Sequence, residues 1–170
     1  MDQLISSDTT SDLDKIHAND LEQFVTFVVN GQLFGVPVLQ VQDILRTEDI
    51  ARVPLAPPEV RGSINLRGRI VTVIDVRIRL GLPKAEDNQQ GMGVTVEQQN
   101  DLYTLLVDEI GEVLSLPSTD REKVPGTLNP AWRDFACGIF QLEKQLMVVL
   151  DIDRLLRKHS ATNTGNGAPN

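Results

Sequence analysis

FVTFVVNGQLFGVPV, residues 24–38, is the stretch that decides the fold class of this chain. FVTFVV (24–29) is rich in β-branched and aromatic residues, which favour strands. Asn30-Gly31 follows, and Asn-Gly is typical of a tight hairpin because both turn positions need positive φ. QLFGVPV (32–38) is then the return strand, and Pro37, which cannot donate a ladder hydrogen bond, marks its edge or its end. The stretch therefore predicts a β-hairpin.

Eight further segments carry similar strand signals between turn formers. VQDILR (41–46) could form a short strand or a helical turn. Arg67-Gly68-Arg69 separates two of the other segments as a tight turn, in which the glycine supplies conformational freedom. The sequence thus predicts about ten strands, and the remaining seven lie at 62–66, 70–75, 92–98, 101–107, 110–116, 137–142 and 145–150.

The second half of the chain repeats the pattern of the first half. Shifting residues 25–45 by 69 positions places them on 94–114 without a gap, and shifting residues 62–80 by 76 places them on 138–156. Apolar positions, turns and trailing acids then coincide. We infer two copies of one five-stranded unit, because each copy alone is too small to bury a large core.

An all-β fold follows from this repeat. Two similar five-stranded β-barrel subdomains, at about 24–80 and 92–150, are expected to pack around a shared core. IDRLLRKH (152–159) is predicted to form a short closing helix with Asp151 as its cap. The polar segments 1–20 and 160–170 are predicted to be disordered tails.

Composition excludes several classes of partner. The chain of 170 residues has a formal net charge of −8 and 4% aromatic residues, so we expect no nucleic-acid partner. No apolar run exceeds five residues, whereas a membrane-spanning helix needs roughly 20, so no direct membrane insertion is expected. The acidic, polar N-terminal stretch lacks the features of a secretory signal, which predicts a cytoplasmic protein.

Residues that could carry catalysis or bind metals are scattered. His17 and His159 have no His, Cys or carboxylate set at metal-ligand spacing, and Ser63 lies outside any nucleophile-elbow motif. Cys137 is the only cysteine, and we interpret it as a small buried hydrophobe within FACGIF (135–140). We therefore predict no catalytic residue, no metal site, no cofactor and no enzymatic activity. The alternative is a small β-barrel enzyme, which would need a convergent acid–base or metal set.

A group of arginines stands out in this acidic chain. Five of them fall within nineteen residues: Arg61, Arg67, Arg69, Arg77 and Arg79. They could be exposed strand and turn charges that suppress aggregation. The other interpretation is a partner-docking site, because arginine in a rigid turn is a common interface anchor.

At these residues the sequence resembles the CheW-like domain family of chemotaxis coupling proteins. VPVLQVQDIL (36–45) and RGSINLRGRIVTVIDVRIRLG (61–81) carry the resemblance, and the motif around Asn65-Leu66-Arg67-Gly68 is its most specific part. VDEIGEVLSLP (107–117) is similar to the matching element of the second half. The resemblance covers a domain at 21–159.

The resemblance implies a non-catalytic adaptor, recruited to membrane receptor arrays, that is monomeric when free. Its partners would be the cytoplasmic tip of a chemoreceptor and the regulatory domain of the chemotaxis histidine kinase CheA. The positions that match the receptor-binding groove are Val41, Asn65, Leu66, Arg67 and Gly68; Ile50, Val53 and Gly62 are placed on the kinase-binding surface. The alternative within the family is an adaptor of a non-flagellar chemosensory cluster, such as one for pilus motility.

Overall fold

The computed structural model describes residues 20–85 and 91–156, so most of the two predicted disordered tails lies outside the described residues. Ten strands are present, and each of the predicted strands is found. They are β1 (Leu21–Val29), β2 (Gln32–Pro37), β3 (Val41–Arg46), β4 (Val60–Leu66), β5 (Arg69–Asp75), β6 (Met92–Gln98), β7 (Asp101–Val107), β8 (Glu109–Pro117), β9 (Ala136–Gln141) and β10 (Leu146–Leu150).

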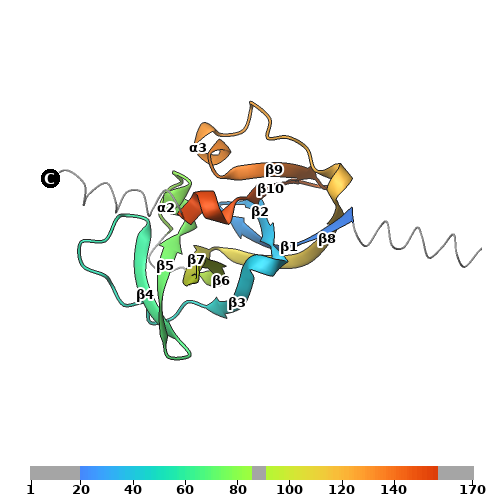
Figure 1. The fold of residues 1–170 in the computed structure, drawn as a ribbon. Helices are drawn as coiled ribbons and strands as arrows, with labels where there is room; N and C mark the ends of the chain where they lie inside the picture. Colours follow the sequence, from blue (N-terminus) through green and yellow to red (C-terminus); the bar gives the residue numbers. More distant parts are fainter. Residues whose placement is uncertain (1–19, 86–90, 157–170) are drawn as a thin grey trace, which may run out of the picture.

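Short helical turns join some of these strands (Figure 1). They are the 3-10 turns η1 (Val38–Gln40) and η2 (Ser118–Asp120), and the single-turn helices α2 (Val76–Arg79) and α3 (Pro130–Arg133). Residues 152–156 are helical and follow β10, as predicted for the start of the closing helix. The remainder of that predicted helix, 157–159, lies outside the described residues. In the part of the chain that the structure describes, no helix is long and apolar enough to cross a bilayer.

The strands form two five-stranded sheets. Sheet A has the order β8-β1-β2-β10-β9, and sheet B has the order β3-β6-β7-β5-β4. Replacing each strand of sheet A by its counterpart in the other repeat gives the order of sheet B. The all-β class with two similar five-stranded units is thereby confirmed. Closed barrels were wrong, because no ladder joins the edge strands β3 and β4, or β8 and β9.

The pairing registers follow the sequence repeat. Phe24 pairs with Pro37, and the positions 69 residues later, Gly93 and Leu106, pair in the same way. The same offset relates the β1–β8 ladder to the β6–β3 ladder. With the offset of 76, the β4–β5 hairpin matches β9–β10 down to the position of its bulge. The repeat read from the sequence is therefore a structural repeat.

The two sheets do not coincide with the contiguous segments 24–80 and 92–150. Sheet A combines β1 and β2 from the first repeat with β8, β9 and β10 from the second, and sheet B combines the rest. The two repeats have the same pairing edges, so the local sequence cannot distinguish pairing within a copy from exchange of strands between copies. Each five-stranded unit is built from both halves of the chain.

The shared core lies between the sheets. It joins side chains such as Phe27 and Phe34 of sheet A to Val94 and Leu105 of sheet B, all of them buried. Each sheet also covers a smaller cluster on its other face, centred on Phe24 and Phe140 in sheet A, and on Ile64, Val71 and Val73 in sheet B. Strands with both faces buried explain the nearly continuous apolar runs of the sequence.

Candidate functional site

The turn between β4 and β5, at the lower end of that hairpin in Figure 1, carries four of the five predicted receptor-binding residues. Arg67 and Gly68 have φ values of 52° and 86°, which is the geometry of a tight hairpin turn. Asn65 Oδ1 accepts a hydrogen bond of 2.9 Å from the Gly68 amide and fixes the turn. The Arg67 side chain, at 81% exposure, therefore projects from a rigid turn.

A salt bridge connects this turn to β3. Arg67 Nη2 lies 3.2 Å from Asp43 Oδ2. Because β3 and β4 are the two edges of sheet B, the pair spans the open side of that sheet. It brings the segment that holds Val41 together with the turn. The pair is largely exposed on the arginine side and contributes little to stability.

The predicted apolar members of this site point partly inward. Leu66 packs against the cluster of Ile64, Val71 and Val73, and Val41 packs against the shared core. Both are half-buried, so each offers only part of its side chain to a partner. Ile70, next to the turn, is 80% exposed. Sequence analysis missed it, although its place beside the turn in an alternating strand was a usable signal.

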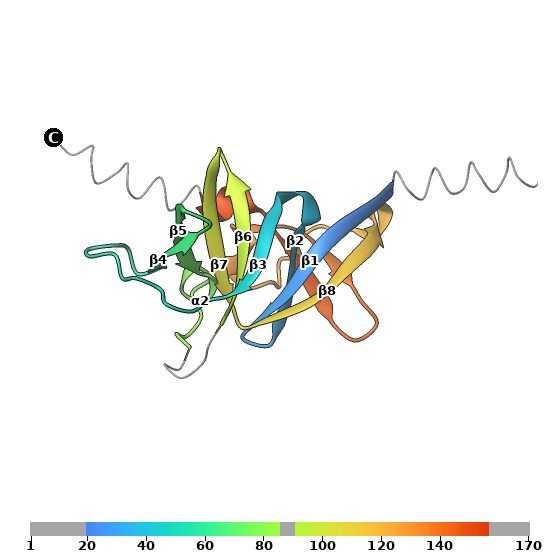
Figure 2. The same ribbon diagram turned by 90° about the horizontal axis from the view of Figure 1, so that it is seen from below.

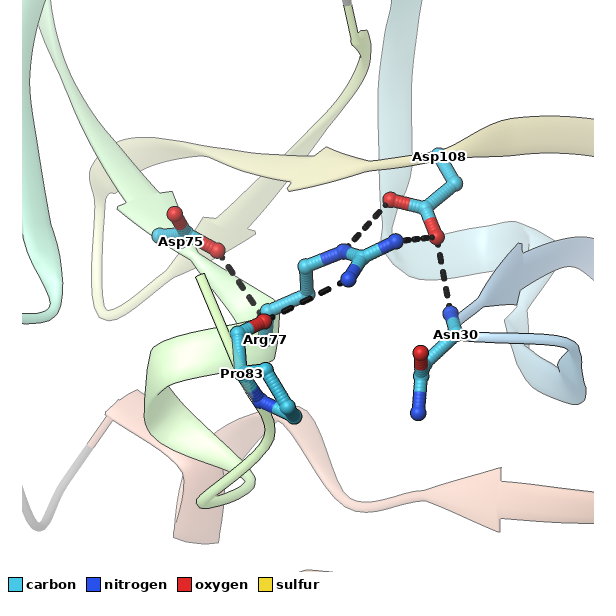
Figure 3. A network of polar contacts seen from close by, with 5 residues as sticks. All are labelled: Asn30, Asp75, Arg77, Pro83 and Asp108. Carbon is cyan, nitrogen blue, oxygen red and sulfur yellow. Dashed lines mark hydrogen bonds and ion pairs between the residues drawn. The ribbon is translucent and has the colours of Figure 1, made fainter. Parts of the chain in front are cut away.

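Three of the five clustered arginines serve the fold instead of a partner, which corrects the docking interpretation for them. Arg61 pairs with the buried Asp75 at 3.4 Å. Arg79 donates from Nε to the Leu155 carbonyl at 2.9 Å. Arg77 belongs to the polar network of Figure 3. Arg67 and Arg69 are the two that remain exposed.

The network of Figure 3 joins the two sheets. Arg77 donates from Nε and Nη2 to the two carboxylate oxygens of Asp108, at 2.9 and 2.6 Å. Asp108 Oδ2 also accepts from the Asn30 amide at 2.7 Å. Asp108 is the single residue between β7 of sheet B and β8 of sheet A. We call Arg77, Asp108 and Asn30 the inter-sheet clip, because they hold the residue at which the chain crosses between sheets.

The charges of the clip stabilise each other. Burial alone would raise the pKa of Asp108, but the hydrogen bonds from Arg77 and from the Asn30 amide, together with the charge of Arg77, lower it below its ordinary value. The hydrogen bond to Asp108 raises the pKa of Arg77, against the opposing effect of burial. Both groups are therefore charged at neutral pH.

The three predicted kinase-binding residues lie around the β3–β4 loop (residues 47–59). Ile50 is half-buried against the small cluster of sheet B, whereas Val53 is 45% exposed. Gly62 has a φ of 150°, and a side chain there would collide with the Ala51 carbonyl. Ala51 and Ser63 exchange backbone hydrogen bonds of 2.9 and 2.8 Å, so Gly62 allows the loop to lie against β4.

A second exposed apolar surface was missed by sequence analysis. Leu39 in η1 is 93% exposed and Leu21 at the start of β1 is 40% exposed. Both line a groove of about 560 Å³ between β1 and η1. Strand-like apolar alternation on both sides of the groove concealed it, since only the 3-10 turn aims Leu39 outward.

The candidate chemistry is that of contact surfaces. Among residues 20–85 and 91–156, no group of His, Cys, Asp and Glu is arranged to hold a metal ion. Cys137 is exposed on β9 instead of buried, because the strand pattern places it on the outer face. Partial desolvation nevertheless raises the pKa of its thiol.

Known proteins share this sequence and fold. The model of the CheW-like domain matches residues 23–160. The chemotaxis protein CheW of Bacillus subtilis is 31% identical over 143 residues, which cover 82% of this chain and 90% of that protein. Protein PilI of Pseudomonas aeruginosa is 27% identical over 125 residues, covering 73% of this chain and 70% of PilI. The crystal structure of the scaffolding protein TtCheW of Thermoanaerobacter tengcongensis matches with a TM-score of 0.71 at 26% identity, over 79% of this chain and 86% of that one.

Proposed function

This chain belongs to the CheW-like domain family, and we propose that it is a non-catalytic adaptor that couples the cytoplasmic tip of a chemoreceptor to the regulatory domain of the chemotaxis histidine kinase CheA. The rigid turn with the exposed Arg67 is the observation that carries this proposal. The adaptor acts in the cytoplasm and is recruited to receptor arrays by the receptor itself.

The receptor-facing surface consists of the Asn65–Gly68 turn with Val41. A fixed turn presents the Arg67 guanidinium at low entropic cost, since Asn65 already holds the backbone. Its planar donors suit carboxylate or carbonyl oxygens on receptor helices. The exposed side chain of Ile70 supplies apolar contact area beside it.

The kinase-facing surface is formed by the β3–β4 loop, with Val53 as its predicted contact. Ile50 and Gly62 hold this loop on β4 and act through its position. The groove beside Leu39 is the alternative kinase surface on this chain, because it too exposes apolar side chains.

The mechanism is positional. One surface grips the receptor and another grips the kinase, and no covalent bond is made or broken. A receptor rearrangement shifts the kinase between states through the difference in contact free energy that the adaptor makes in each state.

Titration of a receptor cytoplasmic fragment with the Arg67→Ala variant tests this function. We expect binding to weaken by about 1–3 kcal/mol, as for an interface anchor. The fold should be unchanged, because the Asp43 pair is exposed. Arg133→Ala is the matched control, since Arg133 is an exposed arginine on α3, far along the chain from the turn. Equal affinities for wild type and Arg67→Ala would remove the turn from the receptor site.

An adaptor of a pilus-motility or other non-flagellar chemosensory cluster is the second candidate. The similarity to PilI favours it. Co-sedimentation with membranes that carry receptors of one cluster or the other, with and without the cognate kinase, distinguishes the two roles.

A further inference from the structure

The outer end of the β3–β4 loop carries exposed apolar side chains. Figure 2 shows the segment between β3 and β4 extending away from the sheets. Val53 is 45% exposed and Leu55 is fully exposed, at 104% of its reference area. Neighbouring apolar side chains left in water on a projecting loop are typical of a protein–protein contact site.

The backbone at Leu55 is strained. Its φ is 60°, in the left-handed region that glycine and asparagine adopt readily and that a leucine rarely adopts. A closing hydrogen bond of 3.4 Å from the Ala56 amide to the Val53 carbonyl shapes the turn around it. Stability alone would favour glycine or asparagine at this position, so the leucine side chain has a use outside the fold.

The equivalent loop of the second repeat is covered by the body of the protein. This β8–β9 segment contains Trp132, whose Nε1 donates to the Leu80 carbonyl at 3.2 Å and whose ring packs edge-on against Phe34 at 5.5 Å. Phe135 at its end is 3% exposed. Of two loops related by the internal repeat, one is satisfied within the chain and the other displays its apolar residues.

Behind the projecting loop lies a basic concavity of about 450 Å³. Arg52, Arg61, Lys84 and Asp75 supply its charged lining. Asp75 is paired with Arg61, which leaves the charges of Arg52 and Lys84. Within the described residues neither of these two takes part in a salt bridge. On a chain of net charge −8, such a local excess of positive charge selects an acidic partner segment.

We propose that the β3–β4 loop docks an acidic segment of the kinase regulatory domain, with Leu55 and Val53 seated in an apolar pocket of that domain and Arg52 and Lys84 facing its carboxylates. This inference rests on the proposed function, which names the kinase as a partner. It adds the chemistry of the contact and assigns it to residues that the family motif does not include.

The variant Leu55→Asn tests the apolar part. Asparagine accepts the left-handed backbone, so the thermal midpoint should stay the same or rise. The affinity of the full chain for the isolated regulatory domain, measured by calorimetry, should fall roughly tenfold. The affinity for a receptor fragment should not change. Leu39→Asn is the matched control, because it makes the same change at another exposed leucine.

The double variant Arg52→Glu with Lys84→Glu tests the electrostatic part. Wild-type affinity should fall between about 50 and about 500 mM NaCl, and the double variant should bind more weakly with a smaller salt dependence. Unchanged affinity of Leu55→Asn, loss of affinity only in Leu39→Asn, or a salt-independent wild type would overturn the docking proposal alone. Failure of the wild-type chain to bind either the regulatory domain or the receptor fragment would instead remove the proposed function.

Discussion

Removal of the Asp108 carboxylate should open the inter-sheet clip. Asp108 accepts two charge-assisted hydrogen bonds from Arg77 and one from the Asn30 amide. The side chains of Arg77 and Asp108 are 14% and 23% exposed, between the limits of a surface pair and a buried pair. Breaking a buried pair costs about 3–5 kcal/mol, and a surface pair contributes about 0–1 kcal/mol. We therefore expect Asp108→Ala to lower the free energy of unfolding by about 2–3 kcal/mol.

A double-mutant cycle separates the pair from other effects of truncation. Urea unfolding of wild type, Arg77→Ala, Asp108→Ala and the double variant should give a coupling energy of about 1–2 kcal/mol. Asp108 has a lowered pKa in the folded state, so its contribution is fully present above its unfolded pKa of about 3.9 and is lost as the pH falls through the lower folded value. The stability gap between wild type and Asp108→Asn should therefore narrow only in acid. A coupling energy below about 0.3 kcal/mol would refute this reasoning, because a pair of that strength is no stronger than an exposed one.

Two further changes test the loop contact and the free thiol. Gly62→Ala should destabilise the fold by about 2–4 kcal/mol, because alanine at a φ of 150° would strain the backbone and collide with the Ala51 carbonyl; Gly126→Ala, which meets open space, is the control, and equal unfolding midpoints for the two variants would contradict the prediction. Cys137 should react with iodoacetamide more slowly at pH 8 than a free cysteine, since desolvation raises the pKa of its thiol, and a rate–pH midpoint at or below about 8.5 would show that its surroundings do not act in this way.

The strands and turns were predictable because their signals are local. Asn30-Gly31 and Arg67-Gly68 both form tight turns with positive φ at the two positions, as hairpin chemistry requires. Alternation and β-branched runs located all ten strands. The offsets of 69 and 76 residues between the repeats were also visible in the sequence, and they reappear as matching registers in the two sheets.

The parts that sequence could not give depend on partners that are distant along the chain. An arginine near a turn looks the same whether it faces solvent, as Arg67 does, or a carboxylate 31 positions away, as Arg77 does. Leu39 and Leu55 carry no polarity signal that distinguishes an exposed leucine from a buried one. Cys137 was misjudged for a related reason, because its apolar neighbours alternate between the two faces of β9.

The exchange of strands between repeats bears directly on how an adaptor transmits position. Four of the eight strand ladders join the two halves of the chain, so no contiguous half can move as a separate body without breaking backbone hydrogen bonds. The only covalent routes between sheets within the described residues are short crossings. One of these is Asp108, held by the inter-sheet clip, and its counterpart 69 residues earlier is the exposed Leu39. One crossing is therefore fixed from within, whereas the other leaves its side chain available for external contact. A receptor bound at the Arg67 turn of sheet B would then displace sheet A together with it, because the ladders and the clip leave no soft joint between them.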